Sequence, residues 1–150
     1  MNVFFTSILV LVAISAVIYF IIIYNGLVNV RNNIDKAWAN IDVLLKQRHD
    51  ELVKLLETCR GYMKYEQELL AKLVQLRSMS AGSSSVGDIS KAEGLISSGL
   101  KSLFAVAENY PDLKANQVFL QLQKRISSLE SEIADRREFY NDSVNVCTII

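Results

Sequence analysis

The chain has 150 residues and no net formal charge, because 16 Lys and Arg side chains balance 16 Asp and Glu side chains. This balance argues against a nucleic-acid-binding protein, which concentrates positive charge on one face. A single proline, and the lack of alternating β-branched runs beyond residue 24, argue against an all-β fold. The composition says little about the chemistry beyond these two exclusions.

The first feature along the chain is an uncharged apolar segment, residues 3–24. A helix rises about 1.5 Å per residue, so this segment is long enough to cross a hydrocarbon core about 30 Å thick. The rest of the chain has a mean hydropathy of roughly −0.2, which is typical of a water-soluble protein. A cleaved signal peptide carries a cation before a shorter apolar stretch, whereas the earliest cation here is Arg31. We therefore expect an uncleaved transmembrane helix in a lipid bilayer.

The cations after this segment predict its orientation. Arg31, Lys36, Lys46 and Arg48 follow it, whereas the N-terminal flank offers only the α-amino group. Positively charged flanks stay in the cytoplasm, so we expect the N-terminus outside and residues 25–150 in the cytoplasm. The opposite orientation, with an extracytoplasmic bitopic coiled coil, is the alternative.

Apolar residues beyond the segment recur every three or four positions, which is the spacing of amphipathic helices. The spacing predicts helices over about 26–79, 91–109 and 112–150. Residues 80–89, rich in Ser and Gly, are expected to form a loop, and Pro111 ends the second helix. The predicted fold is all-α: a single N-terminal transmembrane helix followed by an antiparallel up-down helical bundle with a very long first helix.

Two details concern the helix ends. Ser90 and Glu93 have the spacing of a capping box, in which the two side chains satisfy exposed N–H groups at a helix start. Cys59 and Cys147 fall in the apolar stripes and are expected to be packing residues rather than a disulfide or a metal site. The apolar end Thr148-Ile149-Ile150 has no polar stop, so we expect a continuation of the bundle or a partner to cover it.

Several motifs resemble the two signatures of the LemA family, in the family's order over residues 24–145. The first signature is similar to Tyr24-Asn-Gly-Leu-Val28, Arg31-Asn32, Ala37-Trp-Ala-Asn-Ile-Asp-Val43, Lys46-Gln-Arg-His-Asp50 and Leu56-Glu-Thr-Cys-Arg-Gly-Tyr62. The second is similar to Asn109-Tyr-Pro-Asp-Leu-Lys-Ala-Asn116, Phe119-Leu-Gln-Leu-Gln123 and Arg136-Arg-Glu-Phe-Tyr-Asn141.

The resemblance implies a bacterial protein with one N-terminal membrane helix and a cytoplasmic four-helix domain, without an established molecular activity. Members are often encoded beside a membrane zinc metalloprotease, so the resemblance implies such a protease as a partner. The chain departs from the family near its end, where Cys147-Thr148 replaces a usual Tyr-Asn pair and the Phe-Pro segment and last helix do not follow.

His49 is the only histidine, so a histidine mechanism would use it with Asp42, Asp50 or Cys59. No nucleophile lies on its own helix face within one turn. One histidine among scattered carboxylates also lacks the paired spacing of a metal site. We therefore expect no catalytic, cofactor-binding or metal site, and an interhelical hydrogen bond or a partner contact for His49.

Arg48 and Arg136 each interrupt an apolar stripe. The stripe of Arg136 continues four residues later at Tyr140. A half-buried cation needs a carboxylate or carbonyl partner, so structural pairing is expected; a groove for an acidic peptide or a lipid head group is the alternative. Trp38, between two alanines, is expected to be either a core residue that seals the membrane-proximal end of the bundle or an interface residue.

The sequence thus predicts a membrane-anchored helical interaction or scaffold protein, self-associating as a homo-oligomer at the cytoplasmic face of a bacterial inner membrane, and not an enzyme. The alternatives are the extracytoplasmic coiled coil and an enzyme that uses His49. The residues expected to be interaction or structural polar sites are Arg31, Trp38, Asp42, Arg48, His49, Arg136 and Tyr140.

Overall fold

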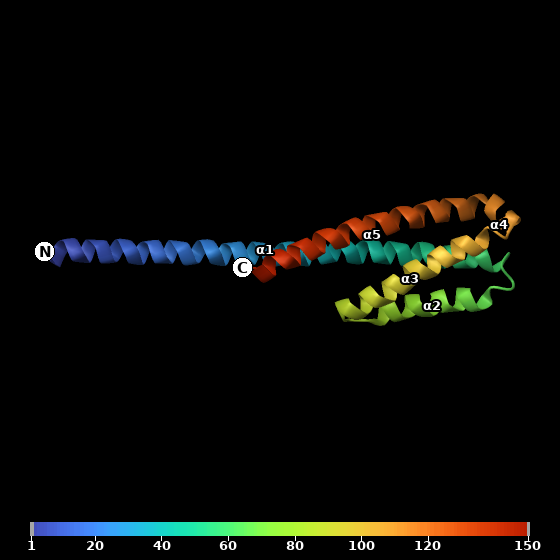
Figure 1. The fold of residues 1–150 in the computed structure, drawn as a ribbon, viewed down its shortest axis with the longest axis horizontal. Helices are drawn as coiled ribbons and strands as arrows, with labels where there is room; N and C mark the ends of the chain where they lie inside the picture. Colours follow the sequence, from blue (N-terminus) through green and yellow to red (C-terminus); the bar gives the residue numbers. More distant parts are fainter. Residues whose placement is uncertain (1, 150) are drawn as a thin grey trace. The chain divides into compact units, whose positions relative to one another are not determined.

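The computed structural model describes the backbone of residues 2–149 and the side chains of residues 4–145. Figure 1 shows its helices, which in chain order are α1 (Asn2–Arg60), α2 (Gln67–Gly82), α3 (Val86–Ala107), α4 (Pro111–Ala115) and α5 (Gln117–Ile149). No strand occurs within residues 2–149, and the all-α prediction is confirmed. The helices belong to two units: a central unit, residues 42–134, and a terminal unit made of the described residues up to Ile41 and from Asp135 onward.

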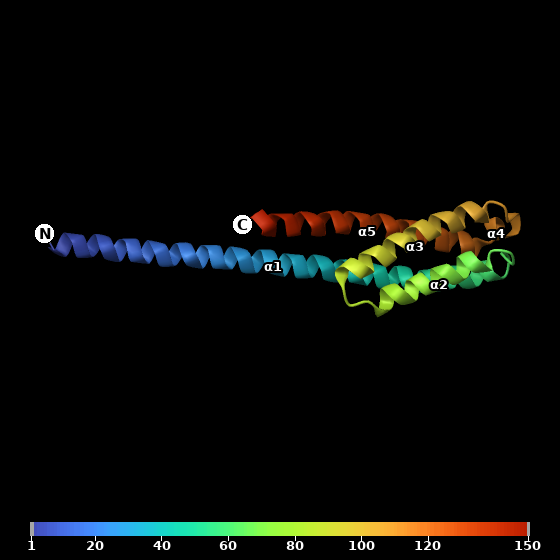
Figure 2. The same ribbon diagram turned by 60° about the horizontal axis from the view of Figure 1, so that its bottom comes forward.

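The central unit has an apolar core to which α1, α2, α3 and α5 all contribute. Figures 1 and 2 both show α3 running back alongside α2. The core residues of each helix are three or four positions apart, as in the predicted stripes. They include Leu52, Leu55, Leu56 and Cys59 of α1, Leu70, Leu73 and Leu76 of α2, Ile96, Leu100 and Leu103 of α3, and Phe119, Leu122 and Ile126 of α5.

Helices α2 and α3 approach closely at Gly99. A Cβ atom added at Gly99 would lie 2.7 Å from Cδ2 of Leu73, a distance at which the buried Leu73 side chain has to shift. Glycine in a helix interior costs about 1 kcal/mol relative to alanine, so the packing of Leu73 against α3 offsets this cost.

The single helix predicted over 26–79 is wrong, because α1 ends at Arg60 and α2 begins at Gln67. Gly61 follows the last helical residue, and the backbone N–H groups of Tyr62 and Met63 both donate to the carbonyl oxygen of Cys59, at 3.0 and 2.8 Å. Met63 is fully buried within the turn. The apolar spacing therefore continues across the break, which is why periodicity alone did not reveal it.

The predicted start of the next helix is also wrong, because α3 runs from Val86 to Ala107 rather than from 91 to 109. Ser90 lies inside this helix, and Ser85, at the N-cap position, makes no side-chain cap hydrogen bond. Glu93 does not cap the helix, since its side chain is completely buried on the core face of α3. The Ser-x-x-Glu spacing therefore does not mark a capping box here, because Ser90 lies within the helix and Glu93 is buried in the core.

The helix predicted over 112–150 is divided by Asn116, whose backbone is extended. The Asn116 side-chain oxygen accepts hydrogen bonds from the N–H groups of Val118 and Phe119, at 2.9 and 3.1 Å. This is the geometry of an N-cap, and it explains why α5 begins at Gln117. The amide nitrogen of Asn116 donates to the Tyr62 hydroxyl at 3.1 Å, which ties the start of α5 to the turn after α1.

The terminal unit contains the apolar part of α1. Large apolar side chains between Phe4 and Val28 are exposed, and this helix is long and apolar enough to cross a membrane. The hydroxyl of Ser15 donates to the carbonyl oxygen of Leu11 at 2.9 Å, so it needs no water. The packing expected for Cys147 and for the end 148–150 concerns side chains outside the described ones.

Candidate functional site

A buried polar cluster joins the helices of the central unit. Among the described residues, the buried polar and charged side chains are Arg48 and His49 of α1, Ser80 of α2 and Glu93 of α3. Burial of charged groups is costly unless they are paired and hydrogen-bonded. The contacts within this cluster therefore decide whether it stabilises the bundle or marks a reactive site.

Glu93 is the centre of the cluster. Its Oε2 atom forms an ion pair with the guanidinium of Arg48. Its Oε1 atom accepts hydrogen bonds from the Ser80 hydroxyl and from Nε2 of His49, at 2.7 Å. Both carboxylate oxygens thus have partners, from two other helices.

Arg48 binds a second carboxylate, that of Glu130 on α5. The same guanidinium donates to the Ser97 hydroxyl at 2.9 Å, and this hydroxyl donates to the carbonyl oxygen of Glu93 at 3.1 Å. Arg48 is only 1% exposed, whereas the Glu130 side chain is 29% exposed. The arginine therefore links α1 to α3 and α5 and has the carboxylate partners that its burial requires.

His49 is neutral in this environment. Burial is the main reason that its pKa is lowered to about 4, and the charges of Arg48 and Arg77 act in the same direction, against the opposite effect of Asp50 and Asp42. A neutral imidazole has one N–H group. Because Nε2 donates to a carboxylate, Nδ1 is left as an acceptor.

The contacts do not activate a nucleophile. The Ser80 hydroxyl and the His49 ring both bind the same oxygen of Glu93, whereas a serine nucleophile needs a direct hydrogen bond to its base. Burial raises the pKa of the Cys59 thiol to about 11, so this thiol is protonated at neutral pH. Within the described residues no group of three or more His, Cys, Asp or Glu side chains is placed to hold a metal ion.

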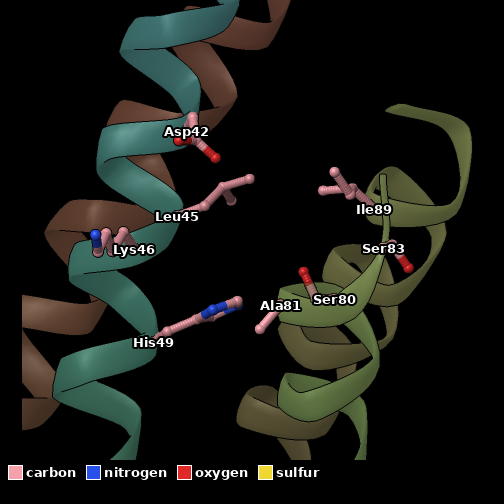
Figure 3. Close-up of a pocket in the computed structure, with 8 residues that line it drawn as sticks. All are labelled: Asp42, Leu45, Lys46, His49, Ser80, Ala81, Ser83 and Ile89. Carbon is pink, nitrogen blue, oxygen red and sulfur yellow. The ribbon is translucent and has the colours of Figure 1, made fainter. Parts of the chain in front are cut away.

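A pocket of about 240 Å³ opens beside His49 (Figure 3). In this view the His49 ring points across the gap toward α2, and the Asp42 carboxylate faces the same gap. The lining consists of Asp42, Leu45, Lys46 and His49 of α1, Ser80 and Ala81 of α2, Ser83 of the following turn, and Ile89 of α3. His49 and Ser80 of the buried cluster thus reach solvent through this pocket.

The other residues predicted as polar or interaction sites lie in the terminal unit. Trp38 and Tyr140 are half-buried and contact each other, with ring centroids 5.6 Å apart and planes inclined at 55°. Arg31 is exposed. Arg136 is also exposed, so the prediction of a half-buried cation there is wrong. In this turn of α5 the half-buried arginine is Arg137, which lies four residues after the buried Ile133.

Sequence reasoning missed Glu93, Glu130 and Ser80. Glu93 carried a usable signal, because it lies three residues before Ile96 within the buried stripe of α3. Glu130 is adjacent to the buried Leu129, and Ser80 continues the α2 stripe four residues after Leu76. A buried arginine predicts that a carboxylate exists, but the pairing itself depends on how the helices meet.

The sequence model described as the LemA family matches residues 37–148. Protein LemA of Metamycoplasma hominis, a curated relative, is 32% identical over 121 residues, which is 78% of this chain and 54% of the relative. The chain therefore spans about half the length of the curated relative that it matches. The polar cluster, from Arg48 to Glu130, lies entirely within the residues that the family model matches.

Proposed function

The chain belongs to the LemA family, and from this premise we propose that it is a membrane-anchored helical scaffold that self-associates at the cytoplasmic face of a bacterial inner membrane. The observation that carries the proposal is the contrast within α1. Its first part is apolar and exposed from Phe4 onward, whereas its last part contributes to the core and to the polar cluster of the central unit.

The anchor is supported by the cost of leaving the apolar part in water. Side chains such as Leu9 and Phe20, each 71% exposed, would lose about 25 cal/mol for every Å² of apolar surface kept from an apolar environment. An exposed apolar stretch of this size marks a membrane or protein contact. A bilayer covers a helix of this length on all sides.

The scaffold role is supported by the polar cluster. Its acids, bases and hydroxyls bind one another, which fixes how α1, α2, α3 and α5 meet. Buried polar pairs of this kind are known to specify register between helices. The central unit therefore has the properties of a fixed surface that binds other proteins. We propose that the chain is not an enzyme.

Self-association is supported by exposed apolar side chains outside the apolar segment. Val43, Leu95, Val118, Leu120 and Phe139 are each between 47% and 56% exposed. One of them, Phe139, is aromatic, and aromatic residues are enriched in protein interfaces. We propose a homo-oligomer as the first partner and a membrane metalloprotease as the second.

The orientation is tested in intact cells with single engineered cysteines, placed in a chain whose Cys59 and Cys147 are replaced by alanine. Ser84→Cys lies in the exposed turn between α2 and α3, and Asn2→Cys lies on the opposite side of the apolar segment. An impermeant maleimide should label Asn2→Cys in intact cells, and Ser84→Cys only after permeabilisation. The reverse pattern would establish the extracytoplasmic alternative.

Self-association is tested on the detergent-extracted full chain. Light scattering should give a defined particle larger than one chain, and amine-reactive cross-linking in membranes should give the same subunit number. A monomer in both experiments would refute the homo-oligomer. Co-expression with a tagged membrane metalloprotease should recover the chain with the protease, and its absence from the purified protease would refute that partner.

A further inference from the structure

The pocket beside His49 offers hydrogen-bond acceptors, because the hydroxyl and imidazole donors in its lining are used elsewhere. The Ser80 hydroxyl donates to Glu93, and the Ser83 hydroxyl donates to the carbonyl oxygen of Met79 at 2.8 Å. His49 donates through Nε2 to Glu93. The lone pairs of His49 Nδ1 and of both hydroxyl oxygens are left for a ligand.

Asp42 adds a negative charge to this set of acceptors. Its carboxylate faces the gap in Figure 3, and it lies seven residues, about two helical turns, before His49 on α1. Lys46 is the one cation among the described residues that line the pocket, and Figure 3 shows its ammonium group turned away from α2. The polar side of the pocket therefore suits a cation that donates several hydrogen bonds.

The remaining lining is apolar. Leu45 of α1 and Ile89 of α3 approach each other across the gap, and Ala81 of α2 lies below them in the view of Figure 3. The volume of about 240 Å³ is below the range of about 300–1,000 Å³ that is typical of sites for drug-sized ligands. A matching ligand has a cationic end and a short hydrocarbon part.

We propose that this pocket binds the ammonium group of a small alkylamine. The cation lies against the Asp42 carboxylate, and the carbon chain lies against Leu45 and Ile89 in the same pocket as His49. A primary ammonium has three donors and no acceptor, which is the complement of this lining. An anion is repelled by Asp42, and an alcohol brings one donor without a charge. The same group occurs in free amines and in the ethanolamine headgroup of a phospholipid.

The test uses n-butylammonium and the full chain in detergent micelles at neutral pH. Because the chain has a single histidine, the ring signal in a carbon–proton NMR spectrum reports on this pocket alone. Butylammonium should shift this signal in a saturable manner with a millimolar dissociation constant, and 1-butanol should not. Asp42→Asn should weaken binding by about fivefold, as expected for an exposed ion pair, and Lys46→Gln should not weaken it.

Thermal unfolding of each variant in the same micelles verifies that it is folded, which is expected since both side chains are exposed. Nanodiscs of phosphatidylethanolamine and of phosphatidylcholine separate the two sources of the ammonium group. If the His49 ring signal shifts in phosphatidylethanolamine nanodiscs without added amine, the ligand is the lipid headgroup. If the shift requires butylammonium, the ligand is a free amine. The proposal is overturned if neither gives a saturable shift, if butanol acts equally, or if Asp42→Asn binds butylammonium as tightly as the unaltered chain.

Discussion

Acidification should destabilise the central unit through His49. The pKa of this histidine is about 4 in the folded chain and 6.5 for the same group without the fold. The unfolded chain therefore takes up the proton first as the pH falls. The stabilisation is complete above pH 6.5 and is lost progressively as the pH falls toward 4.

The magnitude follows from the difference between these two pKa values. One pKa unit corresponds to about 1.4 kcal/mol, so the difference amounts to about 3.5 kcal/mol. The side chain is 11% exposed, and solvent screening at its exposed edge reduces the expected loss to about 2–3 kcal/mol. This is a large share of the stability of a small helical domain, about 5–15 kcal/mol.

Urea unfolding of the full chain in micelles, followed by circular dichroism, measures this loss. His49→Gln is the matched control, because its amide can donate to Glu93 but does not titrate. All other titratable groups are common to both chains, so the difference between the two curves isolates the histidine. The unaltered chain should lose about 2–3 kcal/mol more than the variant on acidification. Parallel loss in both would refute the assignment of a neutral, buried His49.

Three further tests use substitutions in the packed helices. Glu93→Gln should lower the free energy of unfolding by about 3–5 kcal/mol, because it removes the carboxylate of a buried ion pair; a loss below that of a typical surface change in urea unfolding would contradict the buried pair. Gly99→Ala should be destabilising because the added Cβ displaces the buried Leu73 side chain, whereas Gly94→Ala, with open space around it, should be stabilising by about 1 kcal/mol. Equal effects of the two substitutions on the melting temperature would rule out the contact with Leu73. A double-mutant cycle of Trp38→Ala and Tyr140→Ala should give a coupling of about 0.5–1.5 kcal/mol, and strict additivity would show that the ring contact contributes nothing.

The predictable part of the fold was the part that depends on local spacing. The stripes containing Leu52, Leu100 and Ile126 were visible because each core helix repeats its apolar residues every turn. The break after Arg60 was hidden because the buried Met63 keeps the spacing through the turn. Helix ends depend on single hydrogen bonds, such as those of Asn116, which apolar periodicity does not report.

The candidate site was likewise predictable only where it depends on local sequence. A buried Arg48 predicts a need for a carboxylate, since an unpaired buried cation is too costly. The identity of that carboxylate depends on the contact between helices, and Glu93 was misread as a cap because its distance from Ser90 fits both roles. Arg136 was misplaced by one residue, since a three-residue and a four-residue step from Ile133 are equally regular, and the structure uses the four-residue step to Arg137.

The two carboxylates that bind Arg48 are far apart in the order of synthesis. Glu93 is 45 residues after the arginine and Glu130 is 82 residues after it. At about 5–20 residues per second, the ribosome adds the stretch between the two acids in about 2–7 s. During this interval α1, α2 and α3 can already close around a charge-balanced pair of Arg48 and Glu93. The second acid then arrives with α5 at a binding site that exists before it, so the bundle can fold in the order in which it is translated.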